Sequence, residues 1–283
     1  MPNWVMNRII LKGKDASLVA NELLTRDKDT GKEYMDFNNV DRMPETLNIV
    51  CGSCTTPAAE YYLSSINPNN LDVKGEKVTE KEFKKILKKV NSPNKERKIY
   101  GENEFGVQER DFDTLGGERG YLNYGRTICE NRMNYGCSTW YEWSKEHWGV
   151  KWNASSSRVQ RDLNEVTIHF ETPWDGVTKL MCKIGEKYKE KEVTIKYDFS
   201  EEQIAFYDKT IVFENGEVIE GKTYDPDTKE ATEHFMEIWG LENEFVYDPK
   251  TDNYKAKWLM NEKEESKEEN KKENEEEVIH KDE

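Results

Sequence analysis

The amino-acid sequence predicts an α+β fold in which an antiparallel sheet is covered by helices. Near the N-terminus, the predicted order is strand, helix, strand, and from Glu165 to Trp239 it is strand, helix, strand, strand, helix. Several of the predicted strands alternate apolar and polar residues, which is typical of a strand with one buried face. The second of these two runs has the order of elements that a split βαβ, or ferredoxin-like, sandwich requires, with an antiparallel sheet covered on one face by helices.

The N-terminal quarter of the chain supplies the first of these elements. Residues 4–12 are rich in β-forming side chains and predict a central strand. Asp15 is a candidate N-cap for a helix over about 16–26. A short strand is expected within 34–40, and a proline at a first-turn position predicts a helix over 57–65. The quarter thus begins with a strand apolar enough to lie centrally in a sheet, and a helix follows it.

A mixed helical and loop insertion is expected at about 67–160. Thr79 and Glu82 have the spacing of a capping box, in which the hydroxyl and the carboxylate each satisfy an orphan amide, so a helix is expected to follow. Residues 91–120 show little periodicity and resemble a long loop, and 121–135 are predicted to be helical.

Four of the eight tryptophans lie within thirteen residues, in and just after the predicted helix that follows 121–135. Trp140, Trp143 and His147 are spaced so that they share one helix face, and Gly149 is a natural stop for the helix. Buried indoles cover large areas, so we interpret the segment as the centre of a core. The tryptophans expected in the core are Trp140, Trp143, Trp148, Trp152 and Trp174.

The rest of the chain supplies most of the predicted sheet and ends in an acidic tail. Residues 155–164 are polar and are interpreted as a linker, and Asn215-Gly216 predicts a two-residue hairpin turn. Residues 261–283 hold almost nothing that can be buried, so we expect a disordered acidic tail after a domain that spans 1–260. The elements expected between linker and tail are strands over 165–171, 193–197, 204–213 and 218–221, helices over 177–187 and 230–239, and short extended segments at 245–247 and 254–258.

The formal net charge of −15 bears on the choice of partner. The tail contributes −6 of it, with eleven acidic and five basic residues, which leaves −9 on the domain. This sign argues against binding to a nucleic-acid backbone and favours a partner with a basic surface. The sequence has no apolar run long enough to span a membrane and no secretion signal, so we expect a cytoplasmic protein.

The cysteines and histidines give little support for a metal site or for catalysis. The five cysteines have irregular spacing, and Cys51 and Cys54 form a C-x-x-C pair without a second ligand pair, so free thiols are expected and metal binding by the pair is left open. We find no P-loop, no G-x-S-x-G and no H-E-x-x-H. The sequence therefore predicts no cofactor and no enzymatic activity.

Several segments resemble a known family. They are MPNW at the start, FNNVDRMPETL, WYEWSKEHWGVKWNA, ETPWDG and YDFSEEQIAFYDKTIVFENGEVIEG. Together they resemble the YubB ferredoxin-like family of phage and plasmid proteins, from Met1 to about Gly221. The most specific element is W-G-x-K-W at 148–152, followed by Pro173-Trp174. The resemblance implies an accessory protein of a phage or mobile element, and it implies no catalytic residues.

These observations favour a protein that acts by binding another protein. The resemblance suggests an inhibitor of a host antiviral defence complex, and homo-oligomerisation is left open. One alternative is a sponge that captures a nucleotide signal through basic and aromatic side chains, and a second is an uncharacterised enzyme. The candidate ligand-contact residues for these alternatives are Tyr124, Arg126, Arg132, Tyr135 and His147.

Overall fold

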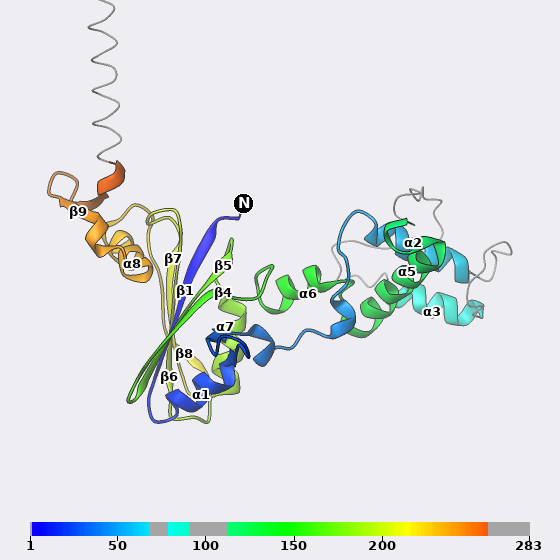
Figure 1. Ribbon diagram of the computed structural model, residues 1–283, viewed down its shortest axis with the longest axis horizontal. Helices are drawn as coiled ribbons and strands as arrows, with labels where there is room; N and C mark the ends of the chain where they lie inside the picture. Colours follow the sequence, from blue (N-terminus) through cyan, green and yellow to red (C-terminus); the bar gives the residue numbers. More distant parts are fainter. Residues whose placement is uncertain (1, 68–78, 91–112, 260–283) are drawn as a thin grey trace, which may run out of the picture. The chain divides into compact units, whose positions relative to one another are not determined.

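The computed structural model describes residues 2–67, 79–90 and 113–259, and the chain divides into two units (Figure 1). The sheet unit comprises Met1–Val40 and Trp152–Glu283, and the helical unit comprises Asp41–Lys151. The inserted unit thus begins earlier and ends earlier than the expected 67–160. Most of the expected long loop at 91–120 and the expected acidic tail lie outside the described residues.

The sheet unit is built on six strands in the order β4-β5-β1-β6-β7-β8, and each neighbouring pair is antiparallel. The central strand β1 is predominantly apolar, as expected from residues 4–12. The strands are β1 (Trp4–Lys12), β4 (Ser155–Asp162), β5 (Glu165–Pro173), β6 (Thr194–Glu201), β7 (Asp208–Glu214) and β8 (Glu217–Thr223).

The strand order confirms the α+β, ferredoxin-like class. β1, α1 (Ala16–Leu23) and β4 form one split βαβ unit with β5 between its strands, and β5, α7 (Thr178–Lys187) and β6 form the other around β1. The prediction that the ferredoxin-like sandwich is formed by the elements from Glu165 onward is therefore incomplete, because β1, α1 and β4 also belong to it. The N-terminal strand is the centre of the sheet, and the helical unit is inserted between α1 and β4.

Side-chain alternation gives the sheet two different faces. Leu11, Ile195 and Phe213 are cross-strand neighbours, all almost fully buried, and the ring of Phe213 lies against Gly185 of α7. Arg8 lies on the opposite face, where it reaches Glu237 of α8 (Lys229–Trp239). Helices therefore cover both faces: α1 and α7 lie on the apolar face, and α8 covers part of the polar one.

The 155–164 segment is β4, so its interpretation as a linker is wrong. β4 is an edge strand whose backbone pairs with β5, and its side chains alternate only between half-buried and exposed, which leaves a polar sequence. The hairpin is confirmed: β7 and β8 are joined by Asn215 and Gly216 with φ of 52° and 84°.

Two further predictions need correction near the N-terminus. The helix predicted over 16–26 ends at Leu23, and Leu24–Arg26 forms β2, which pairs with β3 (Glu33–Met35). The rest of the strand expected within 34–40 is a 3-10 turn at Phe37–Asn39. Strand pairing with β3 replaces the last turn of the predicted helix, and Asp36 caps the 3-10 turn by accepting the Asn38 N–H.

A small cluster follows the sheet. Strands β9 (Phe245–Asp248) and β10 (Asn253–Ala256) pair with each other, after a 3-10 turn at Glu242–Glu244. Phe235 and Met236 of α8 pack with Phe245 in this cluster. Strands β9 and β10 therefore pack on α8, and α8 contacts the polar face of the sheet.

The helical unit contains α2 (Thr55–Ile66), α3 (Glu80–Val90), α5 (Gly117–Tyr135) and α6 (Trp140–His147), with a 3-10 turn at Glu45–Leu47. Gly125 lets α5 approach the backbone of α2 at Ala58, where a side chain would collide with a carbonyl oxygen. The capping box is confirmed, because Thr79 and Glu82 bond reciprocally at the start of α3. None of the helices described has the length and apolar character needed to cross a membrane.

Candidate functional site

The tryptophan-rich segment forms a packed centre within the helical unit. Trp143 and Trp148 are 3% and 4% exposed, and their rings meet edge to face at 5.3 Å. Trp140, which begins α6, is half-buried. Trp148 Nε1 donates to the Asp41 carbonyl oxygen at 2.9 Å. Gly149 has φ of 90°, as expected for a residue that ends a helix.

Trp152 and Trp174 do not belong to this centre, so their assignment to the core is wrong. Both lie in the sheet unit, where they are 39% and 50% exposed and their rings stand 5.8 Å apart. Trp174 has φ of 67°, a conformation rare for a bulky side chain. It follows the end of β5, and its backbone N–H donates to the Asn3 carbonyl oxygen at 2.8 Å. These contacts hold an indole at the end of the sheet instead of inside it.

The structure gives intramolecular partners to four of the five candidate ligand-contact residues. Tyr124 donates to the Val50 carbonyl oxygen. Arg132 donates to Ser138 and forms an ion pair with Glu142. Arg126 forms an ion pair with Glu130. His147 pairs with Asp41, and its ring stacks on Trp143. Tyr135, at the end of α5, is 41% exposed. These side chains therefore support the helical unit, and the structure does not bring them to a common pocket.

The cysteines are all free thiols. Cys51 is exposed and Cys54 is half-buried, at the start of α2. Within 2–67, 79–90 and 113–259, no group of three or more His, Cys, Asp or Glu side chains could hold a metal ion. The C-x-x-C pair thus finds no further ligands in this part of the chain.

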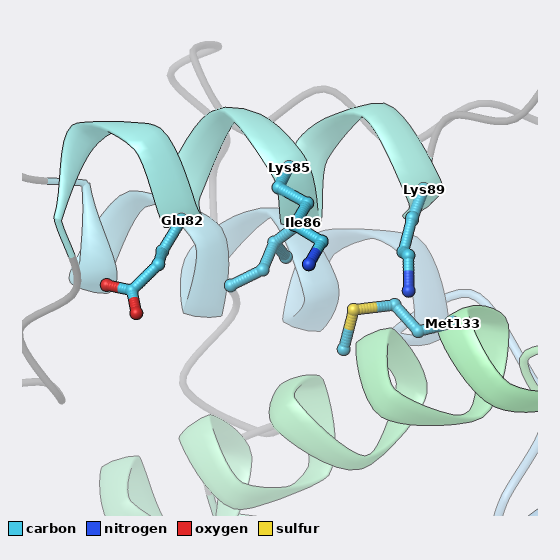
Figure 2. Close-up of a pocket in the computed structure, with 5 residues that line it drawn as sticks. All are labelled: Glu82, Lys85, Ile86, Lys89 and Met133. Atoms are coloured by element: carbon cyan, nitrogen blue, oxygen red, sulfur yellow. The ribbon is translucent and has the colours of Figure 1, made fainter.

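A shallow pocket of about 280 Å³ lies between α3 and α5 (Figure 2). Ile86 and Met133 supply its apolar wall, and Lys85 and Lys89 extend from successive turns of α3 beside them. Glu82 stands at the other end of the lining. The pocket therefore offers a small amphipathic surface, with apolar side chains beside two lysines and a carboxylate.

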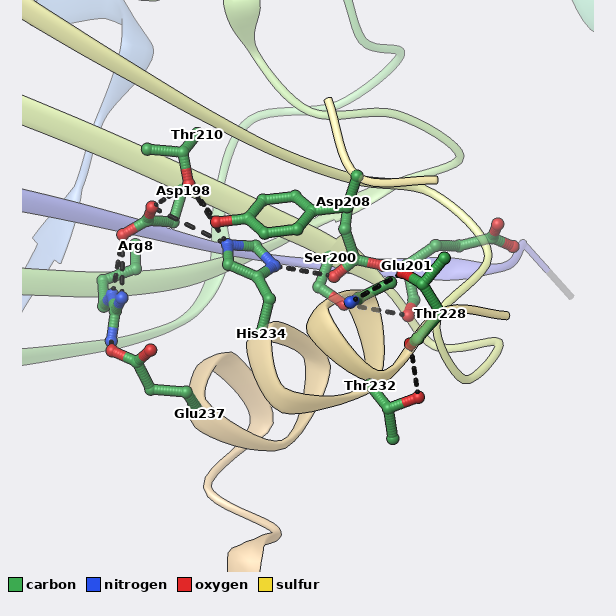
Figure 3. A network of polar contacts seen from close by, with 12 residues as sticks. Arg8, Asp198, Ser200, Glu201, Asp208, Thr210, Thr228, Thr232, His234 and Glu237 are labelled. Atoms are coloured by element: carbon green, nitrogen blue, oxygen red, sulfur yellow. Dashed lines mark hydrogen bonds and ion pairs between the residues drawn. The ribbon is translucent and has the colours of Figure 1, made fainter. Parts of the chain in front are cut away.

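A buried polar network lies between the sheet and α8 (Figure 3). Arg8 on β1 donates to Asp198 on β6 through Nε at 3.1 Å and Nη2 at 2.8 Å, and its Nη1 lies 2.8 Å from Glu237 on α8. Thr210 on β7 donates to the other Asp198 oxygen at 2.6 Å. Asp198 is fully buried and Arg8 is 7% exposed, so this pair is shielded from water.

His234 of α8 completes the network. Its Nδ1 lies 2.8 Å from Asp208 Oδ1, its Nε2 lies 3.7 Å from Asp198 Oδ1, and the ring stacks on Tyr224 at 4.2 Å. Burial alone would lower the pKa of His234, but the hydrogen bonds and charges of Asp198 and Asp208 raise it above its ordinary value. Burial would likewise raise the pKa of Asp198, but His234, Thr210 and Arg8 hold it well below its ordinary range. The network therefore links the buried Arg8, Asp198, Asp208 and His234 to one another and to Glu237, whose side chain is 56% exposed.

This network fastens α8 to the polar face of the sheet. Its charged groups face one another, and Asp198, Asp208 and His234 are each at most 6% exposed, so a substrate does not reach them. Sequence reasoning missed the network. The available signal was a charged residue, Arg8, in the middle of an apolar central strand, where an ion needs a partner.

The network predicts a pH dependence of stability. Because the folded pKa of His234 is raised, its contribution is fully present below the unfolded value of about 6.5 and is lost as pH rises through the folded value. Because the folded pKa of Asp198 is lowered, its contribution is present above about 3.9 and is lost as pH falls through the folded value. Urea unfolding across pH 5.5–8.5 should show stability falling on the alkaline side by at most about 1.4 kcal/mol per pH unit from this one proton.

His234→Gln is the matched variant for that measurement. We expect it to be less stable than the wild type below pH 6.5 and to lose the alkaline decline that His234 causes. An unchanged slope in His234→Gln would show that another group causes the decline.

Exposed aromatic side chains gather at one end of the sheet, which we call the aromatic end. Pro173 at the end of β5 pairs with Trp4 at the start of β1. The end of β6 and the start of β7 lie at this same end of the sheet (Figure 1). The loop from β6 to β7 carries Phe206 and Tyr207, which are 52% and 38% exposed. The aromatic end consists of Trp152, Trp174, Phe206 and Tyr207.

The strand order and the two split βαβ units define a ferredoxin-like α+β domain. A family model described as a ferredoxin-like domain in Api92-like protein matches residues 147–242, which is less than half of the chain. The match supports a ferredoxin-like domain in the C-terminal region, but neither the YubB name nor a phage origin.

A solved structure is also similar to this chain. The crystal structure of the protein api92 from Yersinia pseudotuberculosis is 12% identical, with a TM-score of 0.36, over 81% of this chain and 100% of that one. The search of curated proteins gave no match.

Proposed function

We propose that this protein acts by binding a protein partner with a basic surface, and that the aromatic end is the contact surface. The observation that carries the proposal is the placement of four large aromatic side chains, 38–52% exposed, at one end of a rigid sheet. Aromatic side chains are enriched at protein interfaces, where they bury large areas at small entropic cost. The net charge of −15 would attract a basic partner.

Within this class, we propose an inhibitor of a host antiviral defence complex, encoded by a phage or another mobile element. This finer proposal rests on the resemblance of the sequence segments given above, and the acidic charge and the exposed aromatic end are compatible with it. A protein inhibitor needs a surface that competes for a target and needs no catalytic group.

The test is a pulldown from host-cell lysate with the tagged full chain and mass spectrometry. We expect one protein at near-stoichiometric yield with the wild type, and at least about tenfold less with the Trp174→Ala, Phe206→Ala double variant, because truncation of interface anchors commonly costs about 2 kcal/mol or more. Trp258→Ala is the matched control, since Trp258 is 39% exposed but lies after β10.

Three outcomes would contradict the proposal. Equal capture by the wild type and the double variant would remove the aromatic end as the contact surface. Release of an intact nucleotide on heating, without a protein, would support the sponge. Turnover of a substrate in the same incubation would support an enzyme.

A further inference from the structure

The loop that follows β5 brings a carboxylate to the aromatic end. Gly176 packs so closely on the ring of Phe199 that any side chain there would collide with it. Tyr207 packs on the same Phe199 ring, at 5.1 Å and edge to face. Asp175, which is exposed, lies in the chain between Trp174 and Gly176, and Gly176 and Tyr207 contact the same Phe199 ring.

Electrostatics agrees with this arrangement. Burial and the negative charge of Asp175 together raise the pKa of Tyr207. Asp175 Oδ1 accepts the N–H of Gly176 at 2.7 Å, a bond that fixes the carboxylate within its own loop. Partial burial raises the pKa of Asp175, and the Gly176 N–H and the charges of Lys209 and Lys179 oppose that rise. Neither lysine forms an ion pair with Asp175 in the described part of the chain. The carboxylate therefore retains acceptor capacity for a cation from outside.

We propose that Asp175, Trp174 and Tyr207 form a recognition site for an arginine side chain of the partner. A guanidinium group is planar and weakly hydrated, so it stacks on an aromatic face while it donates hydrogen bonds to a carboxylate. The exposed indole supplies the face, and Asp175 supplies the acceptor. This inference rests on the proposed function and gives the basic partner a specific chemistry.

The probe is the peptide Ac-Gly-Arg-Gly-NH2, titrated into the 15N-labelled full chain at low salt. Its matched analogue carries citrulline, which has the shape of arginine without the charge. We expect the Trp174 indole N–H resonance, assigned with Trp174→Phe, to shift with the arginine peptide and not with the citrulline peptide. The shift should weaken as salt is added, because exposed charges are screened.

Asp175→Asn tests the carboxylate without removing the bond to Gly176, because the amide oxygen can still accept it. We expect binding of the arginine peptide to weaken about fivefold or more in this variant, and to change less than about twofold in Glu202→Gln. Glu202 is an exposed carboxylate that follows β6 at the same end of the sheet, so it controls for net charge. Equal binding by wild type and Asp175→Asn, or an equal response to citrulline, would overturn the inference.

Failure of the inference and failure of the proposed function can be told apart. If Asp175→Asn still captures the partner in the pulldown and the Trp174→Ala, Phe206→Ala variant does not, the aromatic end binds a partner by a chemistry other than arginine recognition. If both variants capture the partner fully, the proposed surface itself is wrong, and the peptide titration then reports on the arginine site alone.

Discussion

Asp198→Asn is expected to lower the free energy of unfolding of the sheet unit by about 3–5 kcal/mol, because it breaks a buried ion pair and leaves its partners charged. Asp198 is fully buried, accepts two hydrogen bonds from Arg8 and one from Thr210, and lies near His234. The amide cannot balance the guanidinium of Arg8 that faces it. Urea unfolding, followed by circular dichroism, measures the loss.

Two variants separate this effect from nonspecific damage. Glu237→Gln changes the other carboxylate that pairs with Arg8, but Glu237 is 56% exposed, so we expect a loss of at most about 1 kcal/mol. The double change Arg8→Met, Asp198→Leu replaces the pair with apolar groups and should be more stable than Asp198→Asn alone. Wild-type stability in Asp198→Asn would show that the carboxylate does not carry the charge we assign to it.

The sequence predicts those elements whose position is set by neighbouring residues in the chain, such as an alternating strand, a hairpin turn or a helix cap. Apolar alternation located β5, Asn215 and Gly216 located the β7–β8 hairpin, and Thr79 with Glu82 located the start of α3. The β4 strand was missed because its hydrogen bonds to β5, and not its side chains, make it a strand. A polar edge strand has the composition of a linker, so composition alone could not distinguish them.

The polar network and the aromatic end were harder to predict because each depends on distant pairing. Arg8 and Asp198 are 190 residues apart, and only the register of β1 against β6 places them opposite each other. Trp152 and Trp174 were assigned to the core because most tryptophan surface is buried on average. That average does not predict the exposure of Trp174, whose backbone φ of 67° places it in the loop at the end of β5. The same two residues therefore account for the main error in the predicted core and for part of the proposed contact surface.

Trp148→Ala is expected to lower the free energy of unfolding of the helical unit by about 3–5 kcal/mol, as a large-to-small change in a core. Trp148 is 4% exposed, packs edge to face on Trp143, and donates its indole N–H to the Asp41 carbonyl oxygen. Removal of the ring leaves a cavity and removes the hydrogen bond to the Asp41 carbonyl oxygen. Amide hydrogen exchange in α6 is the appropriate measurement, because it reports on the helical unit without assuming that both units unfold together.

Trp148→Phe and Trp152→Ala are the matched controls for this prediction. The phenylalanine retains most of the apolar area and loses the hydrogen bond, so it should cost less than the alanine change, including about 1 kcal/mol for that bond. Trp152, 39% exposed and in the sheet unit, should leave protection in α6 close to the wild type when it is replaced by alanine. Wild-type protection in Trp148→Ala would mean that its indole is a contact residue, and the division between core and surface tryptophans argued here would then be wrong.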